Sequence, residues 1–135
     1  MSTLIRLRGL GFQPAAQLDW TEDDIEFKFS HWTPHADQKP VLYAYVDLVG
    51  SRLLYIGQTG GSFKQRSSGY KRWINGRDKR RNAPVNAAWL NCLLGECTSS
   101  KVEVWVTKTC TNDETRKAEE SRLILALTPV LNTKA

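Results

Sequence analysis

The feature that most constrains this 135-residue chain is a strict alternation of apolar and polar side chains on both sides of a short turn. Aliphatic residues alternate with tyrosines and one aspartate over residues 41–48, and a second alternating arm covers residues 53–57. Gly50-Ser51 supplies turn residues between the two arms. A period of two residues around such a turn predicts a β-hairpin.

The register of this hairpin follows from its turn. A turn centred on Gly50 places Tyr45 opposite Tyr55 and Tyr43 opposite Gly57. One face of the hairpin is then aliphatic and is expected to pack on a core, whereas the other carries the tyrosines and Asp47. Tyr43 and Tyr55 lie diagonally on that second face, roughly 7–8 Å apart at the backbone, within joint reach of one small group.

Further elements are predicted after the hairpin. Ser62, which follows two glycines, is expected to cap a helix whose one side carries Phe63, Arg66, Tyr70 and Trp73. A second helix is expected from near Pro84 to Leu94, and residues 102–107 alternate as a third strand. Thr111 and Glu114 form a capping box for a last helix, which Pro129 ends.

The order from residue 41 is therefore β-β-α-α-β-α. Sequential hairpin strands followed by a third strand predict an α+β fold, with a small three-stranded antiparallel sheet flanked by helices. The length suits one compact domain. We expect residues 41–135 to form this domain and residues 1–40 to form an N-terminal extension packed on the core. Within the extension, residues 25–29 alternate like a strand.

Positive charge is concentrated in one segment. The chain carries a net charge of +5, whereas residues 64–81 alone carry +7, so the rest of the chain sums to −2. One basic segment on a slightly acidic body is typical of a phosphate-binding surface, although a solvated loop would have the same composition. The predicted nucleic-acid-binding residues are Lys64, Lys71, Arg72, Arg77, Lys79, Arg80 and Arg81.

Cysteine spacing and hydropathy argue against a cysteine metal site and a membrane protein. The three cysteines are odd in number and lack metal-type spacing, which favours free thiols in a reducing, cytoplasmic compartment. No apolar run approaches the roughly 18 residues of a membrane span, so no membrane partner is expected. His31 and His35 are interpreted as surface or structural residues, because Pro34 disfavours the helix that would align them as a metal pair.

Two charged residues occupy unexpected places. Glu120 shares the apolar side of the last helix with Leu123, Ile124 and Leu127, and Arg66 lies among the aromatic residues of its own helix. A carboxylate on an apolar side is costly unless it is paired or binds a metal. A core ion pair between Glu120 and Arg66 is the structural explanation of this pattern, and a metal site is the functional one.

Taken jointly, these residues resemble the signature of the GIY-YIG nuclease family. The resemblance covers residues 41–132 and consists of Val41-Leu42-Tyr43, Tyr55-Ile56-Gly57, Arg66, and Glu120 followed by Pro129 and Asn132. Each piece alone is weak, but their joint order and spacing are specific. The first motif lacks its glycine, and two spacings are one residue longer than usual, which turn insertions would absorb.

The resemblance implies a DNA endonuclease that hydrolyses phosphodiester bonds with one divalent cation, Mg²⁺ or Mn²⁺ in its place. By this resemblance Tyr43 or Tyr55 positions the attacking water, Arg66 stabilises the phosphate and Glu120 holds the cation. Tyr70 matches a further catalytic position, Asn132 a structural one, and Gly57 is expected to leave room for the sugar-phosphate chain. Similar enzymes act in restriction, excision repair, intron mobility or junction resolution.

Two alternatives use the same residues without catalysis by this chain alone. One is a nucleic-acid-binding module, which would use the basic segment together with Trp73. The other is a nuclease subunit or interaction domain of a larger complex. Because no separate recognition domain is evident, specificity is expected to come from residues 1–40, the basic segment, a homodimer or a partner protein.

Overall fold

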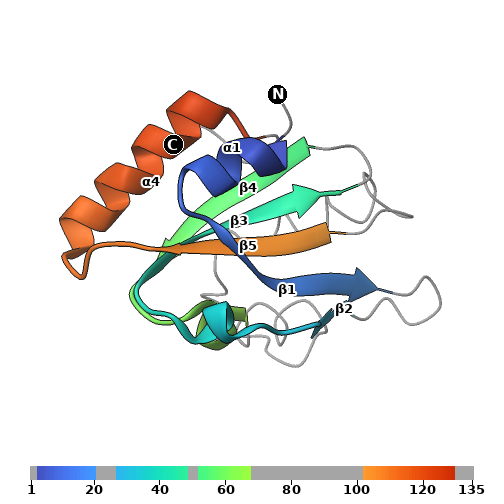
Figure 1. Cartoon of the computed structure of the whole chain (residues 1–135). Coiled ribbons are helices and arrows are strands. Elements are labelled where there is room, and N and C mark those ends of the chain that lie inside the picture. The colour runs from blue at the N-terminus through green and yellow to red at the C-terminus, as the bar shows by residue number, and fades with distance from the viewer. Residues whose placement is uncertain (1–2, 21–26, 49–51, 68–101, 130–135) are drawn as a thin grey trace, which may run out of the picture.

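The computed structural model describes residues 3–20, 27–48, 52–67 and 102–129 (Figure 1). A short helix opens the described chain and a long one closes it, with five strands between them. The elements are α1 (Thr3–Gly9), β1 (Gln13–Trp20), β2 (Phe27–Ser30), the 3₁₀ helix η1 (Pro34–Asp37), β3 (Val41–Asp47), β4 (Arg52–Thr59), β5 (Val102–Lys108) and α4 (Asp113–Leu127). Residues 63–67 are also helical.

The predicted hairpin is confirmed, including its register. Strands β3 and β4 pair antiparallel, with Tyr45 opposite Tyr55 and Tyr43 opposite Gly57. The register shifts by one residue after Tyr45, so that Val46 faces Leu53. This irregularity belongs to the end of the hairpin near the turn, and it leaves the paired tyrosines in the predicted positions.

The prediction of a three-stranded sheet is wrong, although the fold is still α+β. The sheet has five antiparallel strands in the order β2-β1-β5-β3-β4. Strand β5 pairs with β3 along one side and with β1 along the other. The N-terminal segment therefore supplies two strands of the same sheet. The pattern of β1 concealed this, because Pro14 adjoins a register shift that breaks the two-residue period.

Both faces of the sheet are covered. Helices α1 and α4 lie on one face, where Leu7 and the partly buried Leu123, Ile124 and Leu127 pack on the aliphatic residues of the hairpin and on Trp105 (Figure 1). On the opposite face the tyrosines pack with Ala36 of η1 and with Phe63. We call this second layer the tyrosine face; its ring-bearing hairpin residues are Tyr43, Tyr45 and Tyr55.

Local capping signals place the helix starts. Ser62 Oγ accepts a hydrogen bond from Gln65 N–H, and Gln65 Oε1 accepts one from Ser62 N–H. This reciprocal pair is a capping box, so the predicted helix start is confirmed. The last helix begins one residue later than predicted, because Asn112 is its cap and accepts from Thr115 N–H.

The last helix ends at Leu127, before Pro129, as predicted. Thr128 closes it in the left-handed region with φ of 44°. The helix predicted between Pro84 and Leu94 lies outside the described residues. Among the helices of the described ranges, none has the length and apolar character needed to cross a membrane.

Candidate active site

The three hairpin tyrosines form one aromatic cluster on the tyrosine face. Ring centroids are 6.4 Å apart for Tyr43 and Tyr55, 6.1 Å for Tyr43 and Tyr45, and 6.3 Å for Tyr45 and Tyr55. Phe63 packs on this cluster, 5.3 Å from Tyr43 and 5.9 Å from Tyr45. Tyr43 and Tyr55 therefore do come together, as the alternation predicted.

The tyrosines differ in their access to solvent. Tyr43 and Tyr45 are fully buried, whereas Tyr55, on the edge strand β4, is 5% exposed. The tyrosine face is packed, because Phe63 and η1 cover it. Tyr55 is therefore the less completely buried tyrosine of the pair.

Gly57 lies directly against the ring of Tyr43. A Cβ atom at position 57 would lie 2.4 Å from Tyr43 Cζ and 2.5 Å from its hydroxyl oxygen. The space beside Gly57, which the sequence reserved for a sugar-phosphate chain, is thus occupied by the tyrosine itself. Since β4 is the edge strand, the Tyr43 side chain reaches over the last strand of the sheet, with its hydroxyl oxygen beside Gly57.

Lys64 lies within the capping box of the helical residues 63–67, and Arg66 directly follows it. Arg66 is half-buried, and its backbone N–H donates to Ser62 O at 3.1 Å. Lys64 is exposed, with Nζ 5.4 Å from the ring centroid of Trp32. The other predicted binding and catalytic positions lie outside the described residues; they are Tyr70, Lys71, Arg72, Arg77, Lys79, Arg80, Arg81 and Asn132.

Glu120 is half-buried on the sheet side of α4. Within the described ranges its carboxylate has no hydrogen-bond or ion-pair partner, and the alternative of a core ion pair with Arg66 is not formed. Burial raises the pKa of the Glu120 carboxyl above its ordinary value, and the charge of Lys117 partly offsets this effect. The adjacent Glu119 differs, since it accepts a hydrogen bond from the Thr109 hydroxyl.

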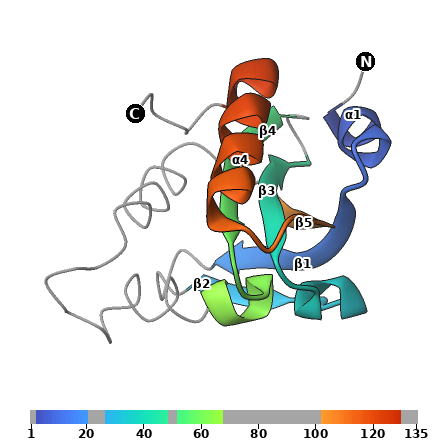
Figure 2. The same ribbon diagram turned by 90° about the vertical axis from the view of Figure 1, so that its left-hand side faces the viewer.

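Helix α4 runs antiparallel to β4, which fixes the level of Glu120 along the strand (Figures 1 and 2). At one end Arg116 Nε donates to Gln58 Oε1 at 2.6 Å, and at the other Leu127 and Leu53 line a common cavity of about 220 Å³. Glu120 lies ~6 Å along the helix from Arg116. That length is about two strand residues, so Glu120 is level with Ile56, whose side chain belongs to the core layer under α4, on the face of the sheet opposite the tyrosines.

The donor set around Glu120 limits the kind of cation it could hold. In the described part of the chain, no three or more His, Cys, Asp or Glu side chains gather as a metal-binding group. A closed all-protein cage is therefore not available from these residues. One unpartnered carboxylate does fit Mg²⁺, which keeps several water ligands and is commonly bound through one or two carboxylates and substrate phosphates.

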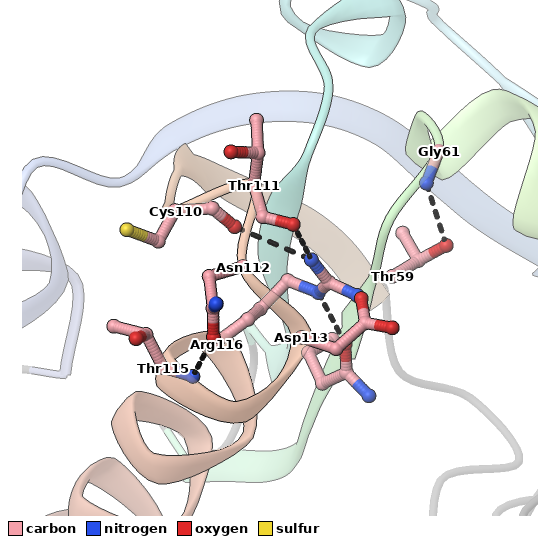
Figure 3. A network of polar contacts seen from close by, with 9 residues as sticks. Thr59, Gly61, Cys110, Thr111, Asn112, Asp113, Thr115 and Arg116 are labelled. Carbon is pink, nitrogen blue, oxygen red and sulfur yellow. Dashed lines mark hydrogen bonds and ion pairs between the residues drawn. The ribbon is translucent and has the colours of Figure 1, made fainter.

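Sequence reasoning missed Arg116. Its side chain is buried at 5% exposure and binds Gln58, the backbone carbonyls of Cys110 and Thr111, and Asp113 (Figure 3). The signal was the spacing, since Arg116 precedes Glu120 by four residues and so shares its side of the helix.

No family model and no curated protein matches this sequence. Solved structures do match. A mutant of EndoII from bacteriophage T4 has a TM-score of 0.68 and 21% identity, covering 98% of this chain and 100% of that chain. The restriction endonuclease HPY188I in complex with product DNA has a TM-score of 0.60 and 11% identity, covering 95% of this chain and 80% of that chain. At these identities the likeness shows that this chain shares their fold.

Proposed function

We propose that this chain is a divalent-metal-dependent DNA endonuclease that hydrolyses phosphodiester bonds at the edge strand β4. The observation that carries the proposal is Glu120, a half-buried carboxylate on α4 without a partner in the described ranges, about level with Ile56 of β4. The fold likeness to EndoII and to a restriction endonuclease in complex with product DNA supports a nuclease. The resemblance of residues 41–132 to the GIY-YIG signature supports the same reaction.

Glu120 would hold the cation in this site. Its burial is costly for an ionised carboxylate, the charge of Lys117 offsets only part of that cost, and a bound divalent ion would compensate the rest. When bound, Mg²⁺ or Mn²⁺ neutralises charge on the phosphate and stabilises the leaving oxygen. Glu120 itself would only bind and orient the cation and would transfer no proton.

Arg66 would bind the scissile phosphate. Its guanidinium can donate two parallel hydrogen bonds to non-bridging oxygens, which a lysine cannot reproduce. Tyr55, the more accessible tyrosine of the pair, would position the attacking water, while Tyr43 supports it from across Gly57. A tyrosine has a reference pKa near 10, so it would need a neighbouring positive charge to act as a base.

Lys64 and the basic residues up to Arg81 would hold the DNA backbone. Phosphate contacts by lysine and arginine supply affinity that does not depend on sequence. Asn132 and Tyr70 remain predicted site residues from the family resemblance, and a homodimer or partner protein remains the predicted source of specificity.

The test compares Glu120→Gln with Glu119→Gln, its neighbour on the same helix. Purified wild-type and variant proteins are incubated with labelled duplex, flap, junction and single-stranded DNA, and with RNA, in Mg²⁺, in Mn²⁺ and in excess EDTA. We expect Glu120→Gln to bind DNA without cutting it and Glu119→Gln to cut normally. Wild-type-level cleavage by Glu120→Gln, or wild-type cleavage that persists in EDTA, would overturn the proposal.

A nucleic-acid-binding module without catalysis is the second candidate. The complete burial of Tyr43 favours it, because a buried hydroxyl contacts substrate only after rearrangement. The same assay separates the two functions: binding of DNA by the wild-type protein without cleavage in Mg²⁺ or Mn²⁺ would support the module.

A further inference from the structure

Arg116 is a buried charge that the proposed chemistry does not use. Nε donates to Gln58 Oε1 at 2.6 Å, and Nη1 donates to the carbonyl oxygens of Cys110 and Thr111, each at 3.3 Å. Nη2 forms an ion pair with Asp113 (Figure 3). A buried guanidinium is costly unless its N–H groups are satisfied, and these contacts satisfy it from three separate segments.

Arg116 joins two elements that carry residues of the proposed site, strand β4 and helix α4. Gln58 follows Gly57 on β4, the strand that also carries Tyr55, and Glu120 lies one helical turn after Arg116 on the same side of α4. The Arg116–Gln58 hydrogen bond therefore connects the strand of the tyrosines to the helix of the carboxylate over a single turn.

Other contacts between α4 and the sheet are of a different kind. Leu123, Ile124 and Leu127 pack on the apolar face, and such packing is non-directional. It holds the helix on the sheet without fixing its position along β4. A charge-assisted hydrogen bond has a defined length and direction, so the Arg116–Gln58 contact is suited to fix that position.

The turn after β4 is also shaped around this guanidinium. A Cβ atom at Gly60 would lie 3.2 Å from Arg116 Nη2, closer than most such contacts. The glycine therefore lets the backbone approach the charge. Two residues after Gly60, Ser62 caps the helix that carries Arg66.

We propose that Arg116 is a positioning residue that, through Gln58, sets the place of Glu120 against β4 and thereby the affinity and geometry of the metal site. This inference rests on the proposed function. Groups that orient a metal ligand by hydrogen-bonding to it change metal affinity or activity by roughly 10- to 100-fold when they are removed, which sets the scale of the effect expected here. Arg116 contacts neither the cation nor the substrate in this scheme.

The experiment perturbs Gln58 first, because removing Arg116 outright leaves several carbonyl groups without a donor. Gln58→Met keeps the size of the side chain and removes the acceptor, Gln58→Glu keeps an acceptor, and Arg116→Lys keeps the charge without the fork. Two readouts are taken: Mn²⁺ affinity of the DNA-free protein by electron paramagnetic resonance, and kcat and KM for a labelled duplex.

We expect Gln58→Met and Arg116→Lys to weaken Mn²⁺ binding and to lower kcat by about 10-fold or more, with KM for DNA changed by less than about twofold. Gln58→Glu should retain most of the wild-type affinity and rate. Arg122→Gln is the matched control, because Arg122 is exposed on the same helix and makes none of the contacts of Arg116, so its replacement should leave both readouts near wild type.

Leu123→Ala separates positioning from general stability. It should lower the melting temperature by loosening α4, while the Mn²⁺ affinity of the folded protein stays near wild type. Folded Gln58→Met and Arg116→Lys proteins with unchanged Mn²⁺ affinity and kcat would overturn the positioning role. Wild-type cleavage by Glu120→Gln would overturn the proposed function instead, whatever Gln58→Met does.

Discussion

The ring of Tyr43 lies across Gly57, so close that a Cβ atom at position 57 would approach the phenol carbon to 2.4 Å. The tyrosine comes from β3 and the glycine from the edge strand β4, directly opposite in the register. A glycine is therefore required here by the packing of one specific side chain. Its role differs from that expected from sequence, where the space was assigned to substrate.

Gly57→Ala is expected to displace the Tyr43 ring. Overpacking of this kind costs about 1–3 kcal/mol, measured by urea denaturation, and cleavage should fall with it. Gly9→Ala is the control, because a Cβ atom there meets nothing within 4 Å. Combining Gly57→Ala with Tyr43→Leu should recover part of the stability. Additive effects of the two substitutions would show that the clash does not involve Tyr43.

The stability of the protein should depend on the ionisation of Glu120. Burial raises the folded-state pKa, so the folded protein binds this proton more tightly than the unfolded chain does. Stability contributed by the protonated form is present below the ordinary glutamate pKa and is lost as pH rises through the raised value. Glu120→Gln removes this dependence. Its melting temperature should match wild type in acid and exceed it at neutral pH; a lower value at neutral pH would contradict the prediction.

Arg66→Lys tests whether the guanidinium acts on the transition state. It keeps the positive charge but removes the bidentate fork, so turnover should fall by about 10²-fold or more. Lys64→Gln is the comparison on the same helix, because Lys64 is exposed and should affect DNA affinity alone. An unchanged turnover with weaker binding in Arg66→Lys would assign Arg66 to DNA positioning.

The three hairpin tyrosines should differ in their effect on cleavage. Tyr43→Phe and Tyr55→Phe should lower the rate by about 10²-fold, as the removal of a group that positions or activates water does. Tyr45→Phe is the control from the same cluster, since it is not part of the predicted pair. Circular dichroism verifies folding of all three variants. A larger fall in rate for Tyr45→Phe than for the others would contradict the assignment.

The basic residues from Lys71 to Arg81 should hold DNA and take no part in cutting. Neutralising Lys79, Arg80 and Arg81 together should lower the slope of log affinity against log salt by about 0.9 for each DNA phosphate that is no longer neutralised, which is up to roughly two to three in all. Turnover at saturating DNA should stay nearly constant. An unaltered slope would show that this run is a solvated surface, and the DNA path would then be sought along residues 1–40.

Local features of this protein could be predicted from sequence alone. The register of β3 and β4 follows from the two-residue period and a turn at Gly50, and the helix after Ser62 follows from a capping box four residues long. Both depend on neighbours in the chain, so the pattern contains the information needed. The pairing of Tyr43 with Gly57 and its closeness to Tyr55 are consequences of that local register.

Contacts between distant segments were decided by the tertiary structure. Strand β1 pairs with β5, which lies more than 80 residues later in the chain. The local alternation of a strand does not predict which other strand it will pair with. The tyrosine face is buried because Phe63 and η1 fold over it, which the alternation of the hairpin alone does not specify. The contact of Arg116 with Gln58 was decided in the same way. The helical period predicts which residues share a side of α4, but only tertiary packing decides what that side contacts.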